Sequence, residues 1–352
     1  MPAIAKPMPH TLPELTSDLA GLLPALSPIA VQGSRLLHDR RLAHVWSAPD
    51  DPSDRRLTPV PGRGPSRLYD VVLDCDAGIV RIAVATNDDG LAMVAAAGPD
   101  ARMRALALDA MFGQALEGLA VRALPGLRIA SLARMPDSCA PEHGWCALRR
   151  AGEETCRIAL HDLSPGVQDA LLGARMPASA RGRWRNLCLR GTVDIGERRL
   201  SVAALRSLEA GDVLLLPLLG SGATLQNAPA TLRIGSGTGR ALCAGGRLAS
   251  TSITLLGELR MMDHDTSLTR EPDLPASALD ELEVPVHFEL ETVSIPLADL
   301  EAIEPGYVIE LGTPAAQARL RLVSCGVVIG EADLVAVAGR LGARITNLVP
   351  RG

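Results

Sequence analysis

The stretch from Val284 to Thr346 decides the fold, and it reads VPVHFELE at 284–291, IPLADLEAIEPGYVIEL at 295–311, RLVSCGVVIGEADLVAV at 321–337 and LGARIT at 341–346. In the first segment, apolar residues alternate with other residues, the pattern of a half-buried strand. Pro305-Gly306 and Gly326 interrupt apolar runs where turns are expected. Between positions 280 and 311 there are nine Asp or Glu and no Lys or Arg. The stretch therefore predicts a small acidic β unit without a catalytic constellation.

A weak internal repeat connects this stretch with the region upstream of it. Leu200–Leu216 aligns with Ile295–Leu311 at a constant offset of 95, and six of the 17 positions are identical. Further on, Ala230–Ser236 is similar to Ala318–Ser324 at a different offset, so the intervening loops differ in length. The shared order of strand, short helical turn, glycine turn and apolar strand predicts one β fold that occurs twice in tandem.

The rest of the chain is expected to be α+β, because strand-like runs at its start alternate with a helical pattern. The fold predicted for the whole chain is a mixed α/β N-terminal domain followed by two small β-rich units, short-strand barrels that pair. A further strand is expected at 91–97, after the turn signal Asn87–Gly90. The predicted boundaries are a proline-rich, partly helical segment at 1–65, an α+β domain at 66–178, a first β unit at 184–260, a linker at 261–278 and a second β unit at 279–350.

Composition narrows the class of protein. The net charge of the 352 residues is −5 with both signs interspersed, which argues against nucleic acid as the main partner. Seven scattered cysteines without a C-x-x-C pair predict free thiols in a reducing cytoplasm. The most apolar run, Val213–Gly220, is far shorter than the roughly 20 residues of a membrane helix. No signal peptide is visible at the N-terminus. We therefore expect a cytoplasmic protein without a membrane span.

Two local patterns resemble functional motifs but do not meet their requirements. Gly235–Gly239 reads GSGTG, but it lacks the third glycine of a dinucleotide fingerprint and the G-K-[ST] of a phosphate loop, so it predicts a hairpin turn. The cysteines and histidines between Cys139 and His161 have no standard zinc-finger spacing. No catalytic motif is present. We predict no catalytic, cofactor or metal residues, and an enzyme with an unrecognised site in the N-terminal domain is the alternative from another class.

A unit of about 70 residues with few aromatic side chains buries little surface alone, so we expect two copies to close one shared core. Mutation of Phe288 to Asp should then unfold the unit. The candidate core and interface residues are Val284, Val286, Phe288, Leu290, Leu320, Leu322, Val327, Val328 and Ile329.

The acidic residues between Asp280 and Glu310 have two interpretations. They are either the solvent face of a strand and a turn, or a docking surface for an arginine-bearing partner helix, where charge sets orientation and association rate. A contact with the basic cluster at the start of the first β unit is a further hypothesis. That cluster consists of Arg181, Arg183, Arg185 and Arg190.

The residues from Leu282 to Val349 resemble the SpoA domain of the flagellar switch protein FliN and of type III secretion C-ring proteins. The matching elements are the VPVHFEL strand, the L-x-x-I-E-P-G-Y-V-I-E-L segment, the G-x-x-I-G-E-A-D-L-V-x-V segment and LGARIT. The region from about Trp184 to Glu258 is similar to a more divergent SpoA domain. Two such units behind an N-terminal α/β region resemble the SctQ family, also called HrcQ, YscQ or SpaO.

The resemblance implies a structural role in the cytoplasmic C-ring, or sorting platform, of a type III secretion injectisome. Family members bind an SctL-type ATPase regulator through their SpoA units and an SctK-type adaptor through the N-terminal region, and they help to load chaperone–effector cargo. Some members also make a short C-terminal product, for which Met261 and Met262 are candidate internal starts. A flagellar switch component similar to FliM or FliN is the first alternative.

Overall fold

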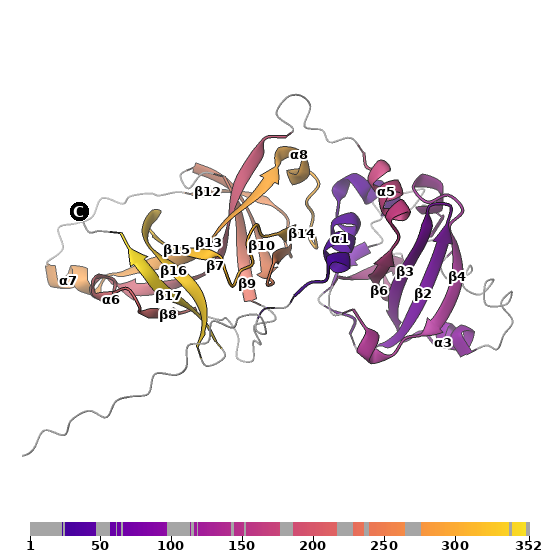
Figure 1. The fold of residues 1–352 in the computed structure, drawn as a ribbon, viewed down its shortest axis with the longest axis horizontal. Helices are drawn as coiled ribbons and strands as arrows, with labels where there is room; N and C mark the ends of the chain where they lie inside the picture. The colour runs from indigo at the N-terminus through magenta and orange to yellow at the C-terminus, as the bar shows by residue number, and fades with distance from the viewer. Residues whose placement is uncertain are drawn as a thin grey trace, which may run out of the picture.

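A computed structural model of the chain contains two bodies that lie side by side, an N-terminal domain and a C-terminal β assembly (Figure 1). Helix α1 lies between them. The structure describes residues 23, 25–46, 57–60, 62–64, 66–96, 113, 116–117, 119–141, 144–150, 153–176, 186–216, 228–235, 239–264, 276–337 and 340–349.

The N-terminal domain is an antiparallel sheet with helices packed on it. In its described part, the sheet has the order β1-β5-β6-β3-β2-β4. Helix α1 packs on β6, where Gly33 lies so close to Leu160 that a Cβ would meet its side chain at 2.7 Å. The elements are α1 (Pro28–Leu37), η1 (Arg40–Leu42), α2 (Ala43–Trp46), β1 (Leu57–Pro59), β2 (Arg67–Cys75), β3 (Gly78–Thr86), α3 (Asp89–Ala96), β4 (Arg128–Arg134), η2 (Asp137–Cys139), β5 (Trp145–Arg150), β6 (Glu153–Leu163) and α5 (Pro165–Gly173).

Local sequence explains where these elements begin. The side chain of Ser27 accepts a hydrogen bond from the backbone N–H of Ala30, and Pro28 occupies the first turn of α1, where its missing N–H costs nothing. The strand expected at 91–97 is wrong, because this segment belongs to helix α3. Asp88 Oδ1 accepts a hydrogen bond from Gly90 N at 2.7 Å, so the turn signal starts a helix.

The C-terminal assembly contains both predicted β units in one sheet. Within the described residues its order is β14-β11-β10-β9-β7-β13-β15-β16-β17-β8, with β12 also paired to β10. Its elements are β7 (Cys188–Ser201), α6 (Val202–Ser207), β8 (Val213–Leu215), β9 (Ala228–Ile234), β10 (Gly239–Leu248), β11 (Ser252–Leu255), β12 (Arg260–His264), α7 (Ala276–Glu281), β13 (Glu283–Pro296), α8 (Leu297–Leu300), β14 (Val308–Glu310), β15 (Arg319–Ser324), β16 (Val327–Val337) and β17 (Arg340–Leu348).

The two units are related by an approximate two-fold axis and exchange strands across it. At the centre, β7 of the first unit pairs antiparallel with its counterpart β13 of the second, from Cys188↔Pro296 to Ser201↔Glu283. At the two ends, β8 of the first unit pairs with β17 of the second, and β14 of the second pairs with β11 of the first. Each unit therefore completes the sheet of the other, an exchange comparable to a swapped dimer within one chain.

Three predicted boundaries need correction. The segment 1–65 is not separate, since Leu36, Leu42 and Val45 pack into the same core as Tyr69 and Val71. The linker predicted at 261–278 begins later, because residues 260–264 form β12 against β10. The two β units are not independent domains, because a single hydrophobic core runs through both of them.

Candidate functional site

The core predicted for the second β unit coincides in part with the observed shared core. Five of the candidate residues are at most 1% exposed and belong to the cluster that spans both units. Val284 is half-buried, and Ile329 packs against the edge of the cluster. The five fully buried candidates are Val286, Phe288, Leu290, Leu320 and Leu322.

Val327 and Val328 are wrongly predicted as core residues, since they are 63% and 38% exposed. They follow Cys325 and Gly326, both at positive φ, in the turn that connects β15 with β16. Both residues pair with the end of β15, Val327 with Ser324 and Val328 with Val323, and the register shifts directly after this pairing. The period-2 pattern of the preceding strand does not continue through the turn, which explains the error.

A charged cluster lies on the outer face of the sheet where the approximate two-fold axis passes. Asp194 and Glu289, which the repeat offset makes equivalent, are paired across β7 and β13. Asp194 Oδ2 lies 3.0 Å from His287 Nδ1, and this hydrogen bond raises the pKa of His287 against the opposing effect of burial. Glu289 accepts a hydrogen bond from Arg321 at 2.9 Å and lies 3.8 Å from Arg233. The two arginines occupy corresponding repeat positions, so this cluster fixes the register of the central pair.

The two bodies meet at an interface that we call the seam, formed by α1 and η1 on one side and by residues 299–310 on the other. It contains many polar groups. Ser34 Oγ of α1 donates a hydrogen bond to the carbonyl of Gly306. Arg35 Nε donates to the carbonyl of Val308 at 3.1 Å, and Arg40 N donates to Ala302 O at 2.9 Å. Backbone groups of the loop between α8 and β14 are thereby paired by α1 and η1. The same residues leave the loop with little access to water.

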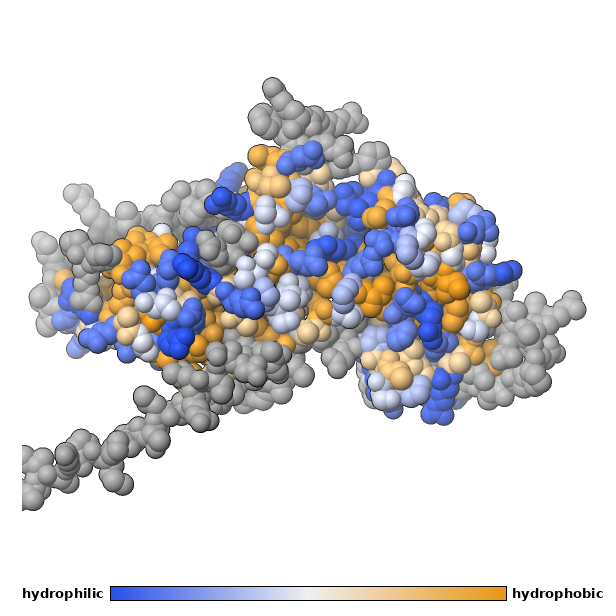
Figure 2. Space-filling view, in the orientation of Figure 1, coloured by the Kyte–Doolittle hydropathy of each residue, from blue (hydrophilic) through white to orange (hydrophobic). Residues whose placement is uncertain are grey.

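Ion pairs reinforce the seam. The guanidinium of Arg35 lies 3.0 Å from Glu310, and that of Arg40 lies 3.1 Å from Glu304. Arg41 Nη1 lies 3.3 Å from Asp299 Oδ1. Figure 2 shows hydrophilic residues gathered over this junction. These three carboxylates belong to the acidic segment 280–310. Their partners are arginines of a helical segment of the same chain.

The second hypothesis for the acidic segment concerned four arginines at the start of the first β unit. Arg181, Arg183 and Arg185 lie outside the described residues, and Arg190 is an exposed residue of β7. The two units do form an ion pair with each other, but it joins α6 to α7 and does not involve this arginine cluster. Arg206 of α6 lies 2.5 Å from Asp280 of α7.

Asp39 is the buried centre of the seam. It is 1% exposed, and its carboxylate accepts hydrogen bonds from the backbone and the guanidinium of Arg41. This side-chain hydrogen bond is the main reason that the pKa of Arg41 is raised. Arg175 Nε lies 2.8 Å from Asp39 Oδ2, an ion pair without hydrogen-bond alignment. A buried carboxylate with two guanidinium partners is costly to disrupt, since the remaining charges lose their compensation.

The cysteine and histidine residues considered for zinc do not converge. Cys146 lies 3.3 Å from His38 Nε2, and burial raises the pKa of Cys146 to about 12. The thiol therefore stays protonated near neutral pH and is not a nucleophile. His143 lies outside the described residues, and within the described part of the chain no group of three or more His, Cys, Asp or Glu could hold a metal ion.

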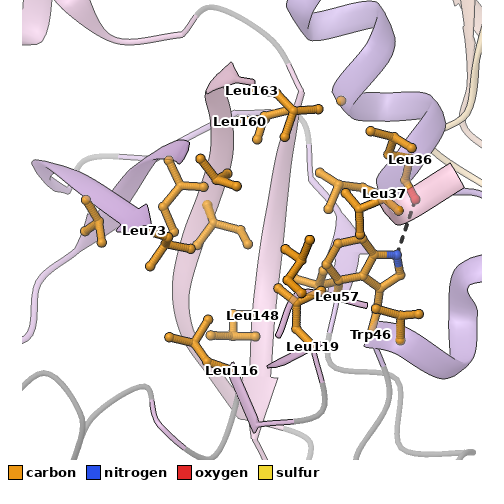
Figure 3. Close-up of a pocket in the computed structure, with 18 of the residues that line it drawn as sticks. Leu36, Leu37, Trp46, Leu57, Leu73, Leu116, Leu119, Leu148, Leu160 and Leu163 are labelled. Atoms are coloured by element: carbon orange, nitrogen blue, oxygen red, sulfur yellow. Dashed lines mark hydrogen bonds between the residues drawn. The ribbon is translucent and has the colours of Figure 1, made fainter. Parts of the chain in front are cut away.

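The N-terminal domain encloses an apolar cavity of about 120 Å³ between its sheet and helices (Figure 3). Trp46 closes one side, with its Nε1 donating to Leu36 O at 3.3 Å. The described residues around the cavity are leucine, valine, isoleucine, glycine and tryptophan, and none of them has a titratable side chain for acid–base catalysis. None of the described helices is long and apolar enough to cross a membrane.

The second β unit matches a known family. Residues 277–350 fit the family described as "Type III flagellar switch regulator (C-ring) FliN C-term". This unit is a FliN-type domain. The match includes β13, which forms the central pair with β7, and the exchanged strand β14, which pairs with β11.

Two curated relatives extend the similarity. The chain is 33% identical over 149 residues to Yop proteins translocation protein Q of Yersinia pseudotuberculosis serotype I (strain IP32953), and equally to the protein of that name from Yersinia pestis. The alignment covers 42% of this chain and 44% of each relative, less than half of either. Together with the FliN-type domain, these matches confirm the resemblance to the SctQ family.

Proposed function

We propose that this chain is a non-enzymatic structural component of the cytoplasmic C-ring of a type III protein secretion apparatus. The single observation that carries the proposal is the strand exchange between the two β units, one of which is FliN-type. Such an exchange joins two repeats into one module, which is a structural role and needs no catalytic residues. The similarity to a Yop translocation protein supports secretion as the process.

The proposed partners are those of the SctQ family. An SctL-type ATPase regulator would bind the paired β units, an SctK-type adaptor would bind the N-terminal domain, and chaperone–effector cargo would be loaded on the assembly. The seam supports this division of labour, because it holds two bodies with different folds in a fixed orientation.

A short C-terminal product is the second part of the proposal. Translation from Met261 or Met262 would yield β13 to β17, including the exchanged strand β14. Two such products could pair through β13 and place β14 of each where β8 lies here. Mass spectrometry of the native gene product tests this, with both methionines replaced in the control. A short species that persists after replacement would contradict these starts.

Deletion and complementation test the function. The deletion strain should lose secretion of type III substrates into the medium, and the wild-type gene should restore it. A Phe288→Asp gene should fail to restore secretion, whereas Val327→Asp, at an exposed position of the same unit, should succeed. Normal secretion by the deletion strain would refute the proposal.

The flagellar alternative rests on the description of the matching family, which names the flagellar switch. The same deletion strain separates the two functions. Loss of swimming with intact secretion would support the flagellar role, and loss of secretion with intact swimming would support the proposal.

Binding to the ATPase regulator should be tested with point variants rather than with truncation. A chain ending after Pro275 loses β13 and β14, and with them the partners of β7 and β11. Truncation would therefore unfold the first β unit as well, and lost binding would not locate the contact.

A further inference from the structure

The seam provides a template for a second docking surface. On the second β unit, α1 and η1 cover the loop between α8 and β14, and Leu300, Ile303 and Glu304 are 9%, 4% and 6% exposed beneath them. Gly306 lies directly under His38, since a Cβ at this position would come within 2.5 Å of its ring. The approximate two-fold axis places an equivalent loop on the first unit, between α6 and β8.

Among the described residues, none packs on the equivalent loop as α1 and η1 pack on its counterpart. At the repeat offset of 95, Leu205, Leu208 and Glu209 correspond to the three buried residues, and here the leucines are half-buried and the glutamate is exposed. Gly211, which corresponds to Gly306, has the same positive backbone φ, 102° against 95°. Within the described part of the chain, a Cβ on Gly211 would meet nothing within 4 Å. The loop has the shape of its counterpart without a helix on it, although α7 contacts the adjacent helix α6 through Arg206 and Asp280.

The two loops share one acidic position, Glu304 and Glu209, and differ in charge at the position of Glu310. Glu310, which holds Arg35 in the seam, corresponds to Leu215 in the first unit. The carbonyl of Leu215 accepts a hydrogen bond from Arg198 Nη1 at 3.1 Å, and Arg344 lies on the neighbouring strand opposite Val213. An arginine in the position of Arg35 would therefore approach the cation of Arg198, whereas Arg344 is already paired with Asp333 at 3.2 Å. The chain's own α1 is a poor occupant of this surface, even from a second copy.

We propose that the loop between α6 and β8 docks a short helix of a partner protein in the manner of α1, and that this helix carries an acidic side chain where α1 carries Arg35. The partner's apolar side chains would cover Leu205 and Leu208. Its acidic side chain would meet Arg198. This inference rests on the internal symmetry of the module and does not depend on the proposed cellular function.

A pair of fluorescent peptides tests the surface on the full chain. One peptide has the sequence of residues 27–42, and the other carries Arg35→Glu and Arg41→Leu, because Ala204 replaces the Asp299 that Arg41 contacts. Fluorescence anisotropy should show saturable binding of the second peptide below about 1 mM. The native peptide should bind at least about tenfold more weakly, a difference of about 1.4 kcal/mol.

Chain variants locate the site. Ser207, the exposed last residue of α6, corresponds to Ala302, whose carbonyl accepts from Arg40 N in the seam. Ser207→Arg should weaken binding at least tenfold, whereas Thr251→Arg, an exposed control in the same unit with the same charge change, should not. Leu215→Glu should reverse the peptide preference. Arg198→Ser, which leaves β8 unchanged, should remove that preference if Leu215→Glu does not fold. Absence of saturable binding, equal binding of both peptides, or unchanged binding by Ser207→Arg would overturn the proposal.

Discussion

Asp194 and Glu289 occupy the same position in the two β units and face each other across β7 and β13. Paired carboxylates at equivalent positions would repel, and each of them has a hydrogen-bonding partner that offsets this: a histidine for Asp194 and an arginine for Glu289. His287 lies against Asp194, while Arg321 and its repeat equivalent Arg233 lie around Glu289. The central pair is therefore held by apolar side chains on the inner face and by charge neutralisation on the outer face.

Replacement of Phe288 by Asp should unfold both β units together. Phe288 is completely buried in the core that they share, and a buried charge without a partner adds to the loss of packing. We expect a loss of about 5 kcal/mol or more in unfolding free energy. Denaturant titration followed by circular dichroism measures it. Val327→Asp, at a 63% exposed position, should stay within about 0.5 kcal/mol of wild type, and a comparable loss in that control would contradict the assignment.

Gly306→Ala and Gly211→Ala form a matched pair that isolates the seam. Both glycines have positive φ, so each alanine should cost about 1–2 kcal/mol in backbone strain. Only the alanine at 306 would collide with His38 and displace α1. Small-angle X-ray scattering should show a larger radius of gyration for Gly306→Ala and no change for Gly211→Ala. Equal dimensions of both variants would show that the seam tolerates the collision.

Asp39→Ala should destabilise the N-terminal domain and its contact with the β units. The change removes the shared partner of Arg41 and Arg175 from a site where Asp39 is 1% exposed. Breaking a buried ion pair from one side costs about 3–5 kcal/mol. Because both arginines retain some access to water, we expect about 3 kcal/mol in denaturant titration. Asp137→Ala, which breaks an exposed pair with Arg63, is the control and should leave the transition unchanged.

Stability of the β assembly should depend on pH through His287. Its hydrogen bond with Asp194 raises its pKa in the folded state, so the folded protein binds the proton more tightly than the unfolded chain. The stabilisation is fully present below the unfolded pKa of about 6.5 and is lost as the pH rises through the folded pKa. The unfolding free energy of wild type relative to His287→Gln should therefore fall as the pH rises from about 6. A difference that is constant or rises with pH would contradict this sign.

The repeat in the sequence predicted a tandem β fold, because an offset of 95 relates both the strands and the glycine turns. The small size and few aromatic side chains of each unit predicted that two copies share a core. It could not predict the exchange of β8 and β14, since a three-residue strand has the same pattern whichever sheet it joins. Val327 and Val328 were misplaced because alternation alone does not locate a turn. The seam was partly visible as an acidic segment that suited an arginine-bearing helix. The sequence could not show that this helix lies in the same chain, because the contact joins residues that are far apart in the sequence.

Native-state hydrogen exchange tests most directly whether the two β units form one folding module. The amides of Leu232 in β9 and Leu320 in β15 lie at the centre of different units, and both side chains are fully buried. If strand exchange makes one module, their slowest exchange should report the same unfolding free energy and the same denaturant dependence. Two distinct free energies, with one unit opening while the other stays protected, would contradict the account.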